Sequence, residues 1–339
     1  MNMERSKDIA PLSGNEDVRL IGIDWGSTGM RVFLMSQNGR IIGHREAASG
    51  ISVIQGGKAA YMRTLQELAG DWLTTWPDAP LLACGMVGSK HGWQEVPYVN
   101  CPADAQHIAR NAIRVDTGSL LAAPSSLHIL PGLLYRPEAG APDVMRGEET
   151  QIVGALQGQS DWASQSCIVM PGTHSKWASI VDGKVHAFAT HMTGELFAVL
   201  KQHSVLGRLM PAASDGAAGR VEEDEACFIA GLEAARKMLG QGLGHQLFSV
   251  RTLGLMGDMP STGLPDYLSG LLIANELLAG LHWRTTHGLG HAPLILIGDA
   301  ALCARYARAL SYLGVKPDAV LVNTAPAGLW HLASVARLV

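Results

Sequence analysis

Apolar runs and glycine-containing turns alternate along this chain in an order that occurs twice. The apolar run 21–25 leads into Gly26-Ser27-Thr28, a second apolar run at 32–35 and an Asn38-Gly39 turn. Roughly 145 residues further on, the run 167–170, the turn 171–175, the run 177–181 and Asp182-Gly183 repeat this order. Short apolar runs bounded by such turns predict strands, and an Asx-Gly pair predicts a hairpin. Each copy therefore predicts three strands joined by a tight turn and then a hairpin.

The rest of each half alternates helical and strand patterns. In the first half we expect helices at 58–73 and 147–156 and strands at 80–84 and 127–130. In the second half we expect helices at 193–203, 224–239, 265–283, 300–313 and 325–338, with strands at 293–297 and 319–322. Such alternation predicts an α/β fold with two mixed sheets flanked by helices. We expect a disordered extension at 1–18, an N-terminal domain at 19–157, a C-terminal domain at 158–339, and an active site in the cleft between the domains.

The two strand-connecting turns have the composition of phosphate-binding turns. Glycine lets the backbone come close to an anion, and N–H groups and hydroxyls can then bind phosphate oxygens. One such turn is a common hairpin, but its repetition favours a pair that grips one polyphosphate from both sides, as in a kinase. The predicted phosphate contacts are Gly26, Ser27 and Thr28 in the first turn and Gly172, Thr173 and His174 in the second.

Composition and charge narrow the class of protein. The 339 residues include 26 Lys+Arg and 30 Asp+Glu, a net charge of −4, without a basic block that nucleic acid would require. Five cysteines without a Cys-x-x-Cys pair argue against a disulfide framework or a zinc site and favour a reducing cytoplasm. No apolar segment is long and uninterrupted enough to span a membrane. We therefore expect a cytoplasmic enzyme for small molecules, and the sequence leaves a homo-oligomer open.

These motifs resemble the actin, Hsp70 and sugar-kinase superfamily, and within it the chain is similar to the 2-dehydro-3-deoxygalactonokinase family. The resemblance covers residue 19 to the end, with Ser175 where the family often has Cys and Gly29-Met30 where it often has Asn-Leu. The matching stretches are Ile-Asp-Trp-Gly-Ser-Thr (23–28), Gly-Met-Val-Gly-Ser (85–89), Val-Met-Arg-Gly-Glu-Glu-Thr-Gln (144–151), Met-Pro-Gly-Thr-His (170–174), Met-Thr-Gly-Glu-Leu (192–196) and Leu-Ser-Gly-Leu-Leu-Ile (268–273).

The resemblance implies an actin-like ATPase (ribonuclease H-like) fold that uses ATP and Mg²⁺. It implies phosphorylation of the 6-hydroxyl of 2-dehydro-3-deoxygalactonate to the 6-phosphate, with release of ADP, in galactonate catabolism. Two alternatives remain open. The acceptor could be another sugar or 2-keto-3-deoxy sugar acid, including the gluconate epimer, or the chain could be an ATP-binding regulatory protein without an acceptor.

The resemblance also suggests roles for charged residues. Asp24 is the candidate ligand for Mg²⁺, through water, because Mg²⁺ keeps much of its hydration shell. Arg31 could neutralise phosphate charge or pair with a surface carboxylate. Gly298 and Asp299, at a strand-to-helix turn, are expected beside adenosine.

The acceptor hydroxyl needs a base, and related sugar kinases carry a carboxylate at the start of a helix before the second hairpin. Glu148 and Glu149 occupy this place. Carboxylates at a helix start are also ordinary partners of the helix dipole. The sequence favours Glu148 slightly and does not decide between the two.

The sugar acid brings a carboxylate, for which Arg146, Lys176 and Lys90 are candidates. Arg146 is favoured because a guanidinium can bind a carboxylate with two parallel bonds. The glycine-rich loop at 85–93 is expected to line the sugar pocket. In the expected pocket, Gly88 and Ser89 offer hydrogen bonds, Trp93 a flat wall and Glu195 an acceptor for sugar hydroxyls.

Overall fold

The computed structural model describes residues 17–117, 126–211 and 224–339, so nearly all of the expected extension at 1–18 lies outside the described residues. The chain divides into two compact units. Unit 1 comprises Met1–Gln165, Ile180–Phe188 and Asn323–Val339, and unit 2 comprises Ser166–Ser179 and Ala189–Val322. Each unit is described by itself below.

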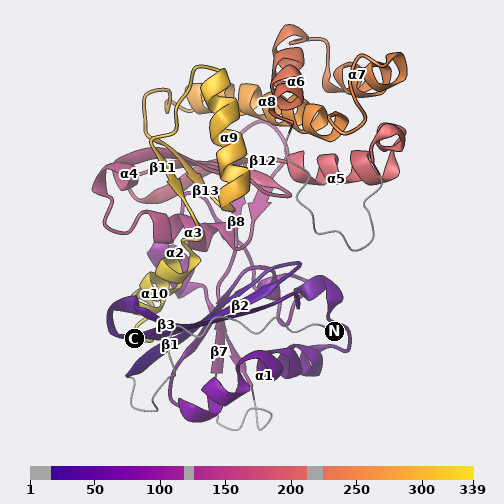
Figure 1. Cartoon of the computed structure of the whole chain (residues 1–339). Coiled ribbons are helices and arrows are strands. Elements are labelled where there is room, and N and C mark those ends of the chain that lie inside the picture. Colours follow the sequence, from indigo (N-terminus) through magenta and orange to yellow (C-terminus); the bar gives the residue numbers. More distant parts are fainter. Residues whose placement is uncertain (1–16, 118–125, 212–223) are drawn as a thin grey trace. The chain divides into compact units, whose positions relative to one another are not determined.

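A mixed sheet forms the centre of unit 1 (Figure 1). Its strand order is β3-β2-β1-β4-β7-β6, with β1 antiparallel to β2 and parallel to β4. Every residue of β4 is buried, as expected for an apolar run in the middle of a sheet covered on both faces. The strands are β1 (Val18–Trp25), β2 (Met30–Ser36), β3 (Ile41–Ala47), β4 (Leu81–Cys84), β6 (Ile113–Asp116) and β7 (Ser126–Ile129).

Helices pack against this sheet at positions without a side chain. Helix α1 (Lys58–Thr75) places Trp72 over Gly43 of β3, and α10 (Ala325–Val335) places Leu329 over Gly22 of β1. Helix α10 also crosses α3 (Glu148–Ala155) closely, because a Cβ added at Gly154 would lie 2.1 Å from Thr324 O. The last helix of the chain therefore holds both the first strand and α3.

Smaller elements complete unit 1. They are η1 (Gln37–Gly39), η2 (Ile51–Val53), η3 (Met86–Gly88), α2 (Ala105–Arg110), α4 (Ser160–Ser164) and a small sheet of β5 (Val99–Asn100), β8 (Leu133–Tyr135) and β9 (Asp143–Met145). Strand β9 ends directly before Arg146 and so leads into the start of α3.

The second large sheet has the order β12-β11-β10-β13-β14, which repeats the order β3-β2-β1-β4-β7 of the first. Strand β10 is parallel to β13, and β13 is parallel to β14. The strands are β10 (Gln165–Met170), β11 (Ser175–Val181), β12 (Lys184–His191), β13 (Leu294–Ile297) and β14 (Ala319–Leu321). The repeated order confirms the α/β fold class with two mixed sheets flanked by helices that the sequence predicted.

Helices follow the strands of the second large sheet along the chain, and Figure 1 shows α6, α7 and α8 together. The helical elements are α5 (Thr193–His203), η5 (Gly207–Leu209), α6 (Glu225–Lys237), α7 (Leu243–Met256), α8 (Leu264–Thr286) and α9 (Ala300–Tyr312). Within the described ranges, no helix has the length and apolar character needed to cross a membrane.

Candidate functional site

The first strand-connecting turn is held from behind by the segment 50–52. Gly26 N–H donates to Gly29 O at 2.9 Å and closes the turn. The carbonyl oxygens of Gly26, Ser27 and Thr28 accept from the three backbone N–H groups of the segment 50–52, at 3.0, 3.1 and 3.1 Å. In a trans peptide the C=O and the next N–H point in opposite directions. The N–H groups of Ser27, Thr28 and Gly29 therefore all point away from that segment, as an anion site requires.

Gly50 and Ser52 allow the segment 50–52 to pack closely against the first turn. A Cβ added at Gly50 would lie 2.2 Å from Ser27 O, so only glycine fits there. The hydroxyl of Ser52 donates a second bond to the same oxygen at 2.6 Å. Neither residue was a candidate from the sequence, since the signal is a contact across 25 residues.

Asp24 lies beside the first turn, in register with Arg31 on β2 and with Cys84 on β4. Its Oδ2 is 3.0 Å from Arg31 Nη2, and the Cys84 thiol donates to its Oδ1 at 3.9 Å. Burial raises the pKa of the Asp24 carboxyl, while Arg31 and Cys84 lower it. Of the two roles left open for Arg31, the structure shows pairing with a carboxylate, and that carboxylate is Asp24. The Arg31 side chain remains 41% exposed and can also meet an anion.

A contact between two glycines brings the start of α3 to the end of β4. Gly85 and Gly147 have φ of 91° and 111°, a region that favours glycine. A Cβ added at Gly147 would lie 3.2 Å from the Cα of Gly85. The two glutamates that follow Gly147 therefore lie in the same unit and at the same edge of the sheet as Asp24 and Cys84.

The two glutamates have different surroundings. Glu149 is 1% exposed and accepts from Gly147 N–H at 2.7 Å and from the Thr150 hydroxyl at 3.1 Å. Burial, and then the charge of Glu148, raise the pKa of Glu149 to about 8. Glu148 is half-buried and accepts from Arg146 N–H at 2.9 Å. Glu148 is the glutamate that solvent, and hence a substrate, can reach.

Arg146 is a buried cation with unused hydrogen-bond donors. Its Nη2 donates to Val96 O at 2.7 Å, and its guanidinium lies 4.3 Å from the centre of the Tyr98 ring. Its Nε and Nη1 have no hydrogen-bond partner in the described part of the chain, and neither does the buried hydroxyl of Ser89, the residue that follows Gly88. A Cβ added at Gly88 would lie 2.9 Å from Nη1, so Gly88 provides the space for this guanidinium. Buried donors without partners are rare in folded proteins and suggest an anionic ligand.

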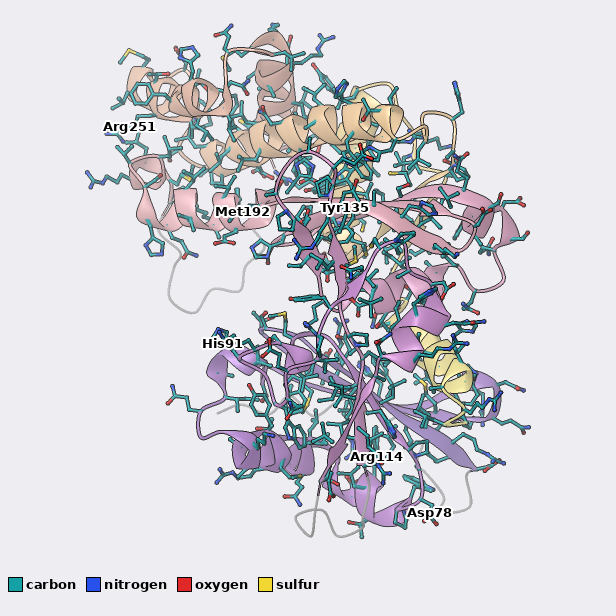
Figure 2. All side chains as sticks on the ribbon, turned by 180° about the vertical axis from the view of Figure 1, so that it is seen from behind. Asp78, His91, Arg114, Tyr135, Met192 and Arg251 are labelled. Carbon is teal, nitrogen blue, oxygen red and sulfur yellow. The ribbon has the colours of Figure 1, made fainter. Side chains whose placement is uncertain are left out.

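The expectation for Trp93 needs correction. Trp93 is 3% exposed and packs with its ring against Trp25 and Tyr61, at centroid distances of 6.2 Å each. It is a core residue of unit 1, and it offers no exposed wall to a sugar. Lys90 and His91 on the same loop are exposed, and Figure 2 shows His91 at the surface.

The second turn is backed by the start of α5 rather than by a loop. Glu195 N–H donates to Thr173 O at 3.0 Å, so the His174 N–H points away from α5. A Cβ added at Gly194 would lie 2.5 Å from Gly172 O, which requires glycine at this close approach. Met192, labelled in Figure 2, directly precedes the helix.

Two residues predicted to contact the sugar acid, Lys176 and Glu195, have hydrogen-bond partners near the second turn, and their contact with the sugar acid stays a prediction. Glu195 is hydrogen-bonded to the His174 ring. The buried Lys176 donates to the Thr190 hydroxyl at 2.7 Å. Both lie in unit 2 with the second turn, whereas Arg146 and Ser89 lie in unit 1. Lys176 and Glu195 therefore support the second turn in this structure.

The Gly298-Asp299 turn lies beside the second turn. A Cβ added at Gly298 would be 3.3 Å from Pro171 O, because β13 and β10 are parallel neighbours. Asp299 caps α9, its Oδ1 accepting from Leu302 N–H at 3.0 Å. Gly298 and the second turn thus meet at one edge of the sheet, where ligands bind in open α/β sheets.

No group of three His, Cys, Asp or Glu side chains suited to a metal ion occurs within residues 17–117, 126–211 and 224–339. Asp24 is a single carboxylate beside a turn with outward N–H groups. This donor set fits Mg²⁺, which usually combines one or two carboxylates with several waters and substrate phosphates.

Comparison with known proteins gives a consistent result. The model of the 2-keto-3-deoxy-galactonokinase family matches residues 24–332. A 2-dehydro-3-deoxygalactonokinase of Escherichia coli (strain K12) is 34% identical over 316 residues, which are 93% of this chain and 97% of the relative. A Rhizobium meliloti (strain 1021) protein assigned to the same activity is 32% identical over 88% of this chain and 90% of its own. A crystal structure of a Sinorhizobium meliloti protein, also assigned to this activity, has a TM-score of 0.74 and 29% identity, with coverage of 93% and 98%.

Proposed function

The chain belongs to the 2-keto-3-deoxygalactonokinase family, and on this premise we propose that it transfers a phosphoryl group from ATP to the 6-hydroxyl of 2-dehydro-3-deoxygalactonate. The products are the 6-phosphate and ADP, and the step belongs to galactonate catabolism. Phosphoryl transfer depends mainly on positioning and charge stabilisation. The roles of the site residues below follow from that requirement.

The observation that best supports a sugar-acid acceptor is the unused donor surface of Arg146. Its Nε and Nη1 lie buried without partners among the described residues, and the buried hydroxyl of Ser89 also has no partner there. A carboxylate bound there would accept two parallel bonds, one from the second hydrogen of Nη2 and one from Nε or Nη1, and the Tyr98 ring would hold the plane of the guanidinium. A neutral sugar would leave the cation without a counter-charge.

In unit 1 the outward N–H groups of Ser27, Thr28 and Gly29 stabilise the phosphoryl group that is transferred, and Arg31 adds positive charge. Glu148 accepts the proton of the acceptor hydroxyl. Glu149 is buried and has both oxygens in hydrogen bonds, so it supports the start of α3 and does not serve as the base.

Asp24 holds Mg²⁺ through water. The ion offsets the charge of the phosphates when it is bound. Two partners hold the Asp24 carboxylate in place: Arg31 contacts Oδ2, and the Cys84 thiol donates to Oδ1.

In unit 2 the second turn binds ATP phosphates through the backbone of Gly172, Thr173 and His174. Gly298 lets adenosine approach the backbone beside this turn. Asp299 uses one oxygen as a helix cap and keeps the other for the ribose.

A steady-state kinetic comparison tests this proposal. ADP release is measured with 2-dehydro-3-deoxygalactonate, its gluconate epimer and the matching 3-deoxy sugar without a carboxylate. In Arg146→Lys we expect KM for the sugar acid to rise by about 10- to 100-fold, with KM for ATP unchanged, because an ammonium cannot form the paired bonds.

Arg45→Lys is the matched control. Arg45 also stacks on an aromatic ring of unit 1, at 4.1 Å from Trp72, but its nitrogens are bonded to Leu68 O and Asp71. We expect both KM values to stay the same in Arg45→Lys. ADP release that does not depend on any sugar acid would favour the regulatory alternative. If the neutral 3-deoxy sugar is phosphorylated with a higher kcat/KM than the sugar acid, the assignment of Arg146 to the carboxylate is refuted.

The location and the assembly of the protein remain predictions. We expect the kinase in the cytoplasm with its small-molecule substrates, and size-exclusion chromatography with light scattering would decide whether it forms a homo-oligomer.

A further inference from the structure

A chain of hydrogen bonds connects the second turn to a carboxylate inside unit 2. Gly172 N–H donates to Ser175 Oγ at 3.3 Å, and Ser175 Oγ lies 3.1 Å from the hydroxyl of Tyr306. The Tyr306 hydroxyl donates to Glu276 Oε2 at 2.6 Å. Glu276 is in the middle of α8, 3% exposed and far along the chain from either turn.

Glu276 accepts two further hydrogen bonds. The indole of Trp177 on β11 donates to Oε1 at 3.0 Å, and the hydroxyl of Thr193 donates to Oε2. Thr193 is the first residue of α5, the helix that backs the second turn. One carboxylate therefore holds the strand that follows the turn, the helix behind it and, through Tyr306, helix α9.

The carboxylate also gives this chain of bonds a direction. An ionised carboxylate accepts hydrogen bonds and donates none. The Tyr306 hydroxyl must therefore donate to Glu276, which leaves its oxygen to accept from Ser175. Because the Ser175 proton is used in that bond, the Ser175 oxygen is held as an acceptor for Gly172 N–H.

We propose that Glu276 is a positioning residue for ATP, which fixes the second turn through Ser175 on one side and Thr193 on the other. This inference rests on the proposed function, in which the second turn binds the ATP phosphates. Hydrogen bonds to a charged acceptor are about twice as strong as neutral ones. Three such bonds compensate the burial of Glu276 and keep the turn in one conformation before ATP arrives.

Tyr306→Phe tests the proposal more gently than a change at Glu276, which could prevent folding. Tyr267→Phe is the matched control, because Tyr267 is also buried in unit 2 and its hydroxyl is 2.8 Å from Ser249 Oγ. Tyr306→Phe removes both hydrogen bonds of the hydroxyl, of which the bond with Ser175 connects to the turn. Loss of that one connection should raise KM for ATP by roughly 2- to 12-fold. KM for the sugar acid should be unchanged, and Tyr267→Phe should change neither KM. Thr193→Val, which keeps the shape of the side chain, should raise KM for ATP alone in the same way.

Amide hydrogen exchange, measured without ATP, gives an independent readout. We expect the Gly172 amide to exchange at least ~2-fold faster in Tyr306→Phe than in Tyr267→Phe. If the two variants have equal KM for ATP and equal exchange at Gly172, the proposal is overturned. If the unmodified protein phosphorylates no sugar acid, the proposed function fails. The exchange comparison still decides whether the hydrogen bonds from Glu276 through Tyr306 and Ser175 hold the second turn.

Discussion

Glu148 and Glu149 are adjacent at the start of α3, yet they have different surroundings and different proposed roles. Both accept a backbone N–H from the residue two positions earlier, at 2.9 and 2.7 Å. The direction of the helix turns Glu149 into the interior, beside Thr150 and Cys84, and leaves Glu148 half-exposed. Access to a substrate hydroxyl therefore distinguishes these carboxylates, since a general base must reach the proton it removes.

Replacing each glutamate by glutamine tests this assignment. Glu148→Gln should lower kcat by about 100-fold or more while both substrates still bind, because an amide keeps the shape but cannot take the proton. Glu149→Gln should keep kcat within about threefold of the unmodified protein. Steady-state kinetics with both substrates varied is the measurement. The opposite pattern would make Glu149 the base.

The raised pKa of Glu149 also predicts a pH dependence of stability. The folded state holds this proton up to about pH 8, whereas an unfolded chain releases it near 4.5, the ordinary pKa of a glutamate. The stabilising contribution of the protonated form is therefore full below pH 4.5 and is lost as the pH rises towards 8. The slope is at most roughly 1.4 kcal/mol per pH unit. Urea unfolding from pH 5 to pH 8 should show a stability advantage of Glu149→Gln that grows with pH. Glu148→Gln removes the second cause of the raised pKa of Glu149 and leaves its burial, so the stability advantage of this variant should grow less with pH than that of Glu149→Gln.

At the scale of elements, glycines decide how closely helices approach one another. Helix α3 crosses α10 where Gly154 faces Thr324 O and Gly328 faces Thr150 O. The Thr324 hydroxyl adds a bond to Gln151 O at 2.7 Å. This crossing fixes the helix whose first residue is the proposed base.

A side chain at this crossing should be costly. Gly154→Ala places a Cβ 2.1 Å from Thr324 O, so we expect a loss of stability of about 1–3 kcal/mol or more. Gly70→Ala on α1 is the control, since its nearest neighbour would be 3.9 Å away. That change should stabilise the protein by up to about 1 kcal/mol, the ordinary helix propensity difference. Thermal unfolding of the two variants measures both effects, and equal shifts of the same sign would contradict the packing argument.

Much of the element order could be predicted from the sequence because the strands are short apolar runs between glycine turns. Helix α7 escaped prediction because its apolar residues do not follow one face: Val250 is buried, whereas Phe248, Leu255 and Met256 are exposed. The short strands β5, β8 and β9 have too few residues for a periodicity. Gly50, Ser52 and Glu276 were missed because their roles depend on contacts that no local pattern records.

At the scale of the whole molecule, the last helix belongs to a different unit from the segment that precedes it in the sequence. Periodicity predicts a helix after residue 324, but an apolar face that contains Leu329 and Leu332 could cover either sheet. Helix α10 contacts β1 and α3 and belongs to unit 1, although the strand before it in the sequence, β14, belongs to unit 2. Unit 1 is therefore incomplete until the last residues of the chain are present.

Removal of residues 323–339 should act selectively. Without α10, Gly22 of β1 loses the cover of Leu329, and α3 loses its crossing partner. We expect amide hydrogen exchange to rise by about 10-fold or more in β1, β4 and α3. Helices α6 and α8 should keep their protection, because their contacts lie within unit 2. Equal loss of protection in both units would show that α10 has no special relation to unit 1.

The different backing of the two turns has a consequence for protein engineering. A graft of residues 24–31 alone into another scaffold would transfer the glycine, the hydroxyls and the aspartate, yet the peptide planes would be free to rotate. In the first turn, hydrogen bonds with the segment that contains Gly50 and Ser52 fix the direction of the N–H groups. In the second turn, the hydrogen bond with the start of α5 has this role. A working transplant must therefore move two separate pieces of chain together, and a different second piece for each turn.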